Sequence, residues 1–200
     1  MKLYYMPGAC SLVINIALRV AGQTPELVKY DIESGKTEDG KMLRDISPKA
    51  YVPVLVADDG EVLTEVVAIL LYFAEKYPSS NLLPDDGSAR RRAIEWLLYT
   101  STEIHKTYTP LFVPTASEAE REAARAKLDR RFQLVEDAYP EKGYLFGDKL
   151  TAADIYLFVT AFWSQPAQYS LEKFPKLSGL IGRAMGVAPV QAALSSEGLA

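Results

Sequence analysis

The sequence is poor in the residues from which disulfides and metal sites are built. It contains one cysteine, Cys10, and one histidine, His105, among 200 residues. A single cysteine cannot form an internal disulfide, and two such side chains are too few for a structural zinc site. We therefore expect no bound metal, and any sulfur chemistry of the protein itself must use Cys10.

Two further absences narrow the range of partners. No apolar run approaches the roughly 18 to 20 residues that a membrane-spanning helix needs, and residues 1–5 show no signal-peptide pattern. The formal net charge is -4, and the lysines and arginines are scattered, with their densest run at residues 90–92. A mildly acidic chain without a basic patch is not expected to bind nucleic acid. We expect a cytoplasmic protein without a membrane partner.

What is present is an ordinary globular composition, with 48% hydrophobic and 24% charged residues. Residues 2–5 and 26–32 predict two parallel strands joined through a helix that begins after Ser11. Residues 52–56 and 62–63 predict a hairpin, because they flank the turn sequence Asp-Asp-Gly. With a short helix near residues 41–46 and another over 65–77, this order predicts a mixed four-stranded sheet with helices, a thioredoxin-like domain.

The second half of the chain shows helical patterns only. Residues 78–86 are rich in Pro, Ser and Asp and lack periodicity, which is typical of a linker. Thr151 and Asp154 have the spacing of a capping box before an apolar run. Helices are predicted over residues 88–112, 117–139, 152–162 and 172–185, with a short one after Pro189. We therefore expect an α/β domain over residues 1–77 and an all-α helical bundle over residues 87–200.

Several separate segments of the chain carry a family resemblance. They are residues 7–12, 47–53, 63–65, 96–99, 103–106, 150–154 and 196–199. In this order and at this spacing, they resemble the bacterial glutathione transferases of the beta class over essentially the whole length. The resemblance implies a homodimer that binds glutathione between its two domains as a co-substrate, without a cofactor. It also implies detoxifying transfer of glutathione to a small hydrophobic electrophile, or thiol transfer or peroxidase chemistry.

The resemblance implies catalytic roles for Cys10 and His105. Cys10 precedes the first predicted helix, where unpaired amides and the helix dipole favour a thiolate, so we expect its pKa to be depressed. In the family the matching cysteine contacts the glutathione sulfur or forms a mixed disulfide with it. His105 would donate a hydrogen bond to that sulfur or help to deprotonate it. Taken without the family, a packed cysteine and a polar surface histidine are the alternatives.

The resemblance also implies a set of glutathione-binding residues. Val52 and Pro53 resemble a cis-proline turn whose backbone meets the cysteinyl part of glutathione, although a trans proline beginning an edge strand is the alternative. Glu65 and the amide of Val66 would hold the γ-glutamyl group, or Glu65 would only complement a helix dipole. Thr102 shares a helical stripe with His105. The complete set is Lys36, Tyr51, Val52, Pro53, Glu65, Val66, Thr102 and Lys106.

Three residues depart from the pattern of the family. Val66 stands where Ser or Gly is usual, Leu98 stands where we expect Asn, and Ala50 replaces a Gly. Each lost polar contact would weaken glutathione binding by on the order of 1 kcal/mol. The alternative function is therefore a ligand-binding or partner-docking protein with weakened or lost glutathione binding. A thiol reductase using Cys10 alone is a third hypothesis, without the second cysteine of an intramolecular dithiol cycle.

Overall fold

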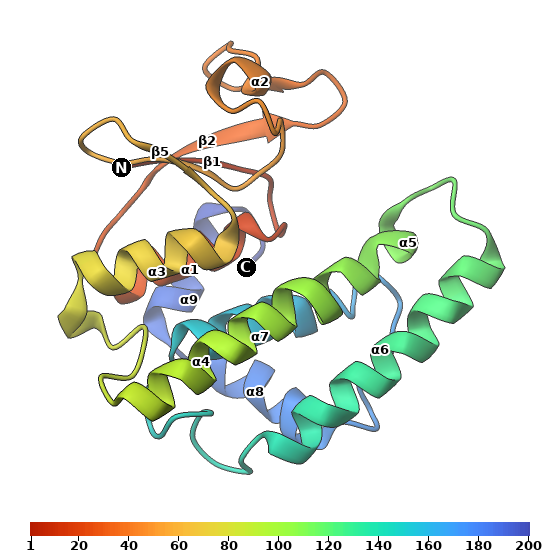
Figure 1. Ribbon diagram of the computed structural model, residues 1–200. Coiled ribbons are helices and arrows are strands. Elements are labelled where there is room, and N and C mark those ends of the chain that lie inside the picture. Colours follow the sequence, from red (N-terminus) through yellow and green to blue (C-terminus); the bar gives the residue numbers. More distant parts are fainter. The chain divides into compact units, whose positions relative to one another are not determined.

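The computed structural model describes residues 1–200, and the chain divides into two structural units (Figure 1). Unit 1 consists of Met1–Leu82 together with Gly186–Ala200, and unit 2 consists of Leu83–Met185. The division between Leu82 and Leu83 falls inside the linker expected at residues 78–86. The last fifteen residues, in contrast, belong to unit 1 and not to the helical domain expected over residues 87–200.

Unit 1 contains a five-stranded mixed sheet in the order β3-β2-β1-β4-β5. Its central strand β1 is parallel to β2 and antiparallel to β4, while β2–β3 and β4–β5 are antiparallel pairs. The prediction of four strands missed β3, which is two residues long and therefore too short to show an alternating pattern. The strands are β1 (Lys2–Tyr5), β2 (Glu26–Asp31), β3 (Lys36–Thr37), β4 (Val54–Val56) and β5 (Val62–Thr64).

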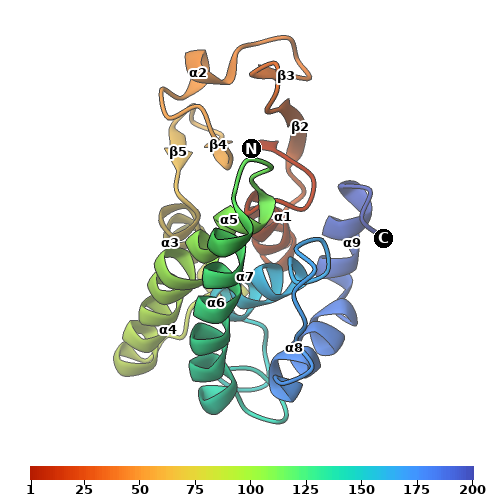
Figure 2. The ribbon, with the colours of Figure 1, turned by 90° about the vertical axis from the view of Figure 1, so that its right-hand side faces the viewer.

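Helices cover the sheet of unit 1 on both faces, as Figures 1 and 2 show. The helices α1 (Ser11–Val20) and α3 (Val66–Lys76) lie on one face, and the short α2 (Leu43–Ile46) lies on the other. Successive side chains of a strand point to opposite faces, so the paired residues Leu3 and Leu55 face α1 and α3. After α3 comes a single 3-10 turn, η1 (Pro78–Ser80).

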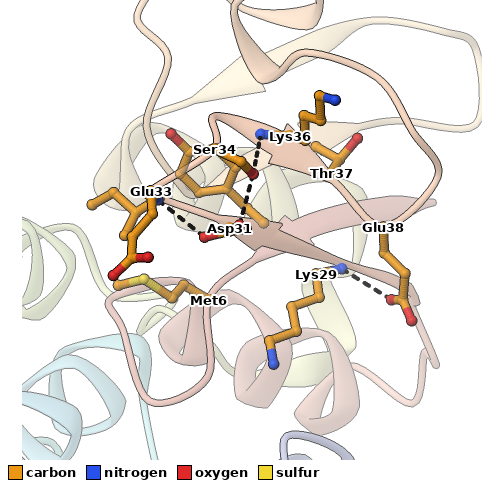
Figure 3. A pocket seen from close by; sticks show the side chains of 10 residues that line it. Met6, Lys29, Asp31, Glu33, Ser34, Lys36, Thr37 and Glu38 are labelled. Atoms are coloured by element: carbon orange, nitrogen blue, oxygen red, sulfur yellow. Dashed lines mark hydrogen bonds between the residues drawn. The ribbon is translucent and has the colours of Figure 1, made fainter.

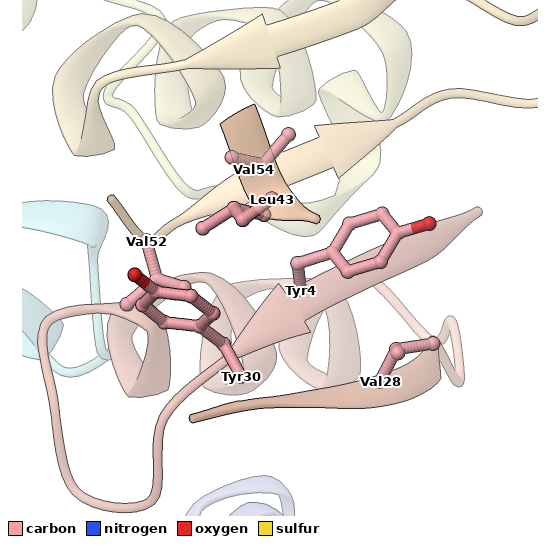
Figure 4. Close-up of a cluster of buried hydrophobic side chains, with 6 residues drawn as sticks. All are labelled: Tyr4, Val28, Tyr30, Leu43, Val52 and Val54. Atoms are coloured by element: carbon pink, nitrogen blue, oxygen red, sulfur yellow. The ribbon is translucent and has the colours of Figure 1, made fainter. Parts of the chain in front are cut away.

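The face of the sheet beneath α2 carries a compact apolar cluster (Figure 4). Leu43, the first residue of α2, is fully buried there, which stabilises the fold by about 2 to 3 kcal/mol. Val52 belongs to the same cluster, so packing fixes the backbone just ahead of Pro53. The cluster consists of Tyr4, Val28, Tyr30, Leu43, Val52 and Val54.

The C-terminal helix α9 (Ala188–Ser196) packs against α1, which explains why it belongs to unit 1. Asn15 of α1 is fully buried and donates to Ser196 Oγ at 3.1 Å and to Glu197 Oε1 at 3.0 Å. A buried amide needs such partners, so these bonds tie the end of the chain to α1. The pattern of α9 alone contains no sign of this partner.

Unit 2 is built around α7 (Ala152–Phe162), whose residues 152–161 are all buried. Figures 1 and 2 show α4 (Gly87–Tyr99), α6 (Glu118–Ala138) and α8 (Pro175–Met185) arranged around it. No helix taken singly has the length and apolar character needed to cross a membrane; only α8 and α9 counted as a pair meet that test, on length and composition alone.

The predicted capping box at the start of α7 is confirmed. Asp154 accepts hydrogen bonds from the Thr151 amide at 3.0 Å and from the Thr151 hydroxyl at 2.5 Å. The same buried carboxylate accepts from the Tyr139 hydroxyl at 2.7 Å and from the Leu145 amide at 3.0 Å. Burial, together with the neighbouring Asp154 carboxylate, raises the pKa of Tyr139 above its ordinary value.

The helix predicted over residues 88–112 is interrupted in the structure. After α4 the chain forms a π-helical turn, η2 (Thr100–Ile104), and a 3-10 turn, η3 (His105–Tyr108), before α5 (Thr109–Phe112). Pro110 supplies a physical reason, because its ring would clash with the carbonyl of Lys106 in a continuous α-helix. The π-turn also changes the rotation of every residue that follows it.

We predict that Tyr108→Phe stabilises the protein by about 1 kcal/mol. The Tyr108 hydroxyl is buried among aromatic rings without a hydrogen-bond partner, so its removal relieves a desolvation cost. Urea unfolding measures the change. The matched control is Tyr139→Phe, which removes an equally buried hydroxyl that is bonded to Asp154 and should destabilise by about 2 kcal/mol. Equal losses in both variants would contradict the prediction.

Candidate functional site

Cys10 lies at the N-terminal end of α1, as predicted. The turn that contains it is closed by hydrogen bonds of the Ser11 side chain. Ser11 is fully buried, its hydroxyl donates to the Met6 carbonyl at 3.2 Å, and it accepts from the Met6 amide at 3.2 Å. The Cys10 thiol donates to the Val52 carbonyl oxygen at 3.5 Å. The structure therefore brings together two of the predicted site residues, Cys10 and the backbone of Val52. The depressed pKa of Cys10 stays a prediction.

The Val52–Pro53 peptide bond is cis, so the expectation from the resemblance is confirmed and the trans alternative is wrong. Ala50, two residues earlier, has a φ of 53°. This is the left-handed region, which favours glycine because a β-carbon crowds the backbone there. The departure from the glycine of the family therefore has a local conformational cost.

Glu65 and Tyr51, both predicted to bind glutathione, lie together in unit 1. Glu65 Oε1 accepts from the Tyr51 hydroxyl at 2.7 Å and from Lys49 Nζ at 2.7 Å. The hydrogen bond to Glu65 is the main cause that raises the pKa of Tyr51. Lys49 was not among the predicted residues, because an exposed lysine before a turn has no distinguishing pattern. We call these three residues the Glu65 cluster.

The backbone of Glu65 is itself unusual. Its φ is 69° with a ψ of 121°, which non-glycine residues rarely adopt. Strained backbone of this kind gathers at ligand-binding sites, where the surrounding structure holds it in place. Val66, the first residue of α3, is only 6% exposed, so its side chain packs into the unit and offers no hydroxyl to a ligand.

Lys36 lies apart from the Glu65 cluster, on the short edge strand β3. It lines a groove of about 640 Å³ with residues of β2, β3 and the segment that joins them, and with Met6 (Figure 3). The lining of this groove does not include Cys10, Val52 or Glu65. No hydrogen bond or ion pair joins the Lys36 side chain to the other predicted residues of unit 1.

In unit 2, His105 begins the 3-10 turn η3 and contacts two aromatic residues. Its Nδ1 lies 2.8 Å from the Tyr156 hydroxyl oxygen. Its ring also meets the Trp163 ring edge-on, with centroids 4.8 Å apart. Tyr156 comes from the buried helix α7 and is 1% exposed. Both aromatic residues were missed, because in the sequence they belong to an apolar pattern that predicts core.

Leu98, Thr102 and His105 were expected to lie along one face of a regular α-helix, and they do not. The π-turn η2 lies between Leu98 and His105, so α-helical spacing does not hold there. Thr102 is exposed, and its hydroxyl donates to the Leu98 carbonyl at 3.0 Å. The Leu98 side chain is 50% exposed, and Lys106 is exposed as well. The four residues keep their places on one stretch of chain but not on one α-helical face.

A buried carboxylate holds the segment that precedes Cys10. Glu197 Oε2 accepts from the Gly8 amide at 2.9 Å, while Glu197 Oε1 accepts from Asn15 at 3.0 Å. Arg19 Nε donates to the other side of the Asn15 amide at 2.9 Å. Burial raises the pKa of Glu197 to about 6, although the bonds from Asn15 and Gly8 act in the opposite direction. The resemblance had included residues 196–199 without a role.

Comparisons with known proteins match both units of the chain to one family. The N-terminal domain model of the glutathione S-transferases matches residues 3–81, and the C-terminal domain model matches residues 96–186. The glutathione S-transferase GstA of Escherichia coli O157:H7 is 40% identical over 200 residues, with both chains fully covered.

Two solved structures are similar over the full length of both chains. One is a bacterial beta class glutathione S-transferase from Sphingomonas chungbukensis, with 38% identity and a TM-score of 0.93. The other is a sphingomonad glutathione S-transferase complexed with glutathione, with 38% identity and a TM-score of 0.92.

We predict that Ala50→Gly stabilises the protein by about 0.5 to 1 kcal/mol. Relief of a left-handed alanine is worth about 1 to 2 kcal/mol, and the greater freedom of glycine in the unfolded chain offsets part of it. Thermal or urea unfolding measures the change. The control is Ala123→Gly on the exposed side of α6, which should destabilise by about 1 kcal/mol. A loss of stability in both variants would refute the strain at Ala50.

The raised pKa of Glu197 predicts a pH-dependent contribution to stability. The folded pKa of about 6 exceeds the ordinary value of 4.5, so the folded state holds the proton more tightly. The stabilising contribution is complete below pH 4.5 and is lost as the pH rises through 6. At 1.36 kcal/mol per pKa unit, the loss is about 2 kcal/mol.

The measurement is the free energy of unfolding of wild type minus that of Glu197→Gln between pH 4 and pH 7.5. Titrations common to both proteins cancel, so this difference should move against the wild type by about 2 kcal/mol as the pH rises. Glu122→Gln, at an exposed position of α6, should give a difference with little pH dependence. A flat or rising difference for Glu197→Gln would contradict the assignment.

Proposed function

The chain belongs to the glutathione S-transferase family, and from that premise we propose that Cys10 and His105 serve the sulfur of bound glutathione. Its function is that of a transferase with glutathione as co-substrate. The observation that carries the proposal is the Cys10 thiol at the start of α1, 3.5 Å from the Val52 carbonyl beside the cis-proline. That backbone is the proposed partner of the cysteinyl part of glutathione.

The proposed reaction is attack of the glutathione thiolate on a small hydrophobic electrophile. The thiol of glutathione loses its proton to solvent, and its sulfur forms a bond to an electrophilic carbon. The leaving group departs with the electrons of the bond that breaks. Hydrogen-bond donors placed at the sulfur lower the barrier by stabilising the thiolate, which is the role proposed for His105. The proposed setting is a cytoplasmic homodimer.

The Glu65 cluster supplies a site for the γ-glutamyl end. The ammonium of glutathione would bind the Glu65 carboxylate, whose Oε1 already accepts from Lys49 and Tyr51. The carboxylate of the same group would bind the Val66 amide at the start of α3, where backbone amides are unpaired. Lys36, Thr102 and Lys106 are proposed as further contacts to glutathione.

A second candidate function follows from Val66 and Leu98. The buried Val66 offers no hydroxyl, and the half-exposed Leu98 offers an apolar side chain where an amide is expected. Both changes weaken recognition of glutathione. The candidate is a ligand-binding protein on the same scaffold, in which glutathione binding has decayed.

The test is calorimetric titration of glutathione, together with turnover of a chlorinated nitroaromatic electrophile. We expect wild type to bind glutathione with a micromolar to low-millimolar Kd and to turn the electrophile over. Cys10→Ala should impair the reaction, and His105→Ala should lower kcat by at least tenfold, because each removes a group proposed to act at the sulfur. Melting temperatures check that both variants fold.

Val66→Ser separates the two candidates. In a transferase it should tighten glutathione binding by roughly fivefold, the equivalent of about 1 kcal/mol for one regained hydrogen bond. Val67→Ser, one position further along α3, is the matched control and should leave the Kd unchanged. Absence of binding in wild type, with binding restored in Val66→Ser, would favour the decayed site. Absence of binding in both would refute the transferase proposal.

A further inference from the structure

Two residues of unit 2 outside the predicted site contact the His105 ring. Nδ1 of His105 lies 2.8 Å from the Tyr156 hydroxyl, and the Trp163 ring stands edge-on to the imidazole. We propose that Tyr156 is a positioning residue that keeps His105 in the tautomer with its proton on Nε2. His105 then acts at the glutathione sulfur as a hydrogen-bond donor and not as a base. The inference rests on the proposed role of His105.

The direction of the hydrogen bond follows from the basicity of its two ends. An imidazole nitrogen takes up a proton near pH 6.5, whereas a phenol gives up its proton only near pH 10 and is a very weak base. The shared hydrogen is therefore best placed on the Tyr156 oxygen and donated to Nδ1 of His105. A neutral imidazole carries one N–H and one acceptor nitrogen, so an accepting Nδ1 leaves the proton on Nε2.

The position of the Tyr156 hydroxyl is fixed by its helix. Residues 152–161 of α7 are all buried, and the capping box of Thr151 and Asp154 sets the start of the helix. The Thr160 hydroxyl donates to the Tyr156 carbonyl at 3.1 Å one turn later. A side chain that is 1% exposed on such a helix has little freedom to turn away. Aromatic surroundings also strengthen the bond to His105, because they exclude water.

His105 itself lies at a change of helix type. The π-turn η2 ends at Ile104 and the 3-10 turn η3 begins at His105, so the His105 ring is presented by an irregular piece of backbone. Such backbone alone leaves the ring orientation open. The contacts from Tyr156 and Trp163 supply the constraint that a regular helix face would otherwise give.

The consequence for the reaction concerns the proton of the glutathione thiol. Nδ1 of His105 is occupied by the Tyr156 hydroxyl, and Nε2 already carries a proton. While the hydrogen bond from Tyr156 and the proposed one from Nε2 to the sulfur persist, His105 cannot take the proton of the thiol. The proton passes to solvent, and the Nε2–H of His105 stabilises the thiolate that remains. The rate should therefore depend on the donor at the sulfur and not on a basic imidazole.

Because His105 is the only histidine, nitrogen NMR of the imidazole tests the proposal without ambiguity. In 15N-labelled wild type at pH 8, we expect one protonated nitrogen, Nε2, and one accepting nitrogen, Nδ1. In Tyr156→Phe the two tautomers should interconvert and both signals should move toward averaged positions. Tyr144→Phe removes a tyrosine hydroxyl elsewhere in unit 2 and should retain the wild-type spectrum. A proton on Nδ1 in wild type, or an unchanged spectrum in Tyr156→Phe, overturns the proposal.

Kinetics then connect the tautomer with the reaction. Tyr156→Phe should lower kcat roughly fivefold, the effect of losing one neutral hydrogen bond, with the KM for glutathione unchanged. In the His105→Ala background it should cause no further loss, because Tyr156 acts through His105. An equal loss in both backgrounds overturns the positioning role. Full activity of His105→Ala would refute the proposed function of His105, whereas the NMR result tests the tautomer separately.

Discussion

Unit 2 depends on a carboxylate that water cannot reach. Asp154 is fully buried, and it is stabilised by four hydrogen bonds, two from Thr151 and one each from Tyr139 and Leu145. A buried charge without such donors would cost several kcal/mol, so the arrangement has few alternatives. The bonds fix the position of the first turn of α7. Because the helix is regular, the position and orientation of every later residue in it follow from that turn. Tyr156, two residues beyond Asp154, receives its place in this way.

The segment around His105 does not by itself fix the orientation of the His105 ring, and residues of α7 and its C-terminal end do. Pro110 cannot stand in the interior of a continuous α-helix, and the residues before it form π and 3-10 turns. In these turns side-chain directions differ from those of an α-helix. Local backbone therefore does not fix the His105 ring, but Tyr156 and Trp163 do. The irregular segment can thus hold His105, the proposed catalytic group, in a defined orientation because a rigid, fully packed helix lies beside it.

Unit 1 uses packing in a comparable way to maintain strained backbone. Ala50 and Glu65 both have left-handed φ values, and such residues persist only where neighbouring structure over-determines them. Val52, buried in the cluster beneath α2, holds the chain just after Ala50. Lys49 and Tyr51 both donate hydrogen bonds to the Glu65 side chain. The ligand-binding residues proposed for the γ-glutamyl group are therefore positioned by strain that the core of unit 1 maintains.

The parts of this structure that could be predicted are those in which the deciding interaction is local in sequence. The Thr151–Asp154 cap and the position of Cys10 before α1 are of this kind. The interruption at residues 100–108 was missed because a pattern counted at 3.6 residues per turn cannot show a π-turn. The partners Asn15 and Glu197, like His105 and Tyr156, are far apart in the chain, and a buried tyrosine reads as core. The family resemblance nominates His105, because residue type alone predicts only a polar surface histidine. Its proposed tautomer depends on a neighbour 51 residues away, which only the fold identifies.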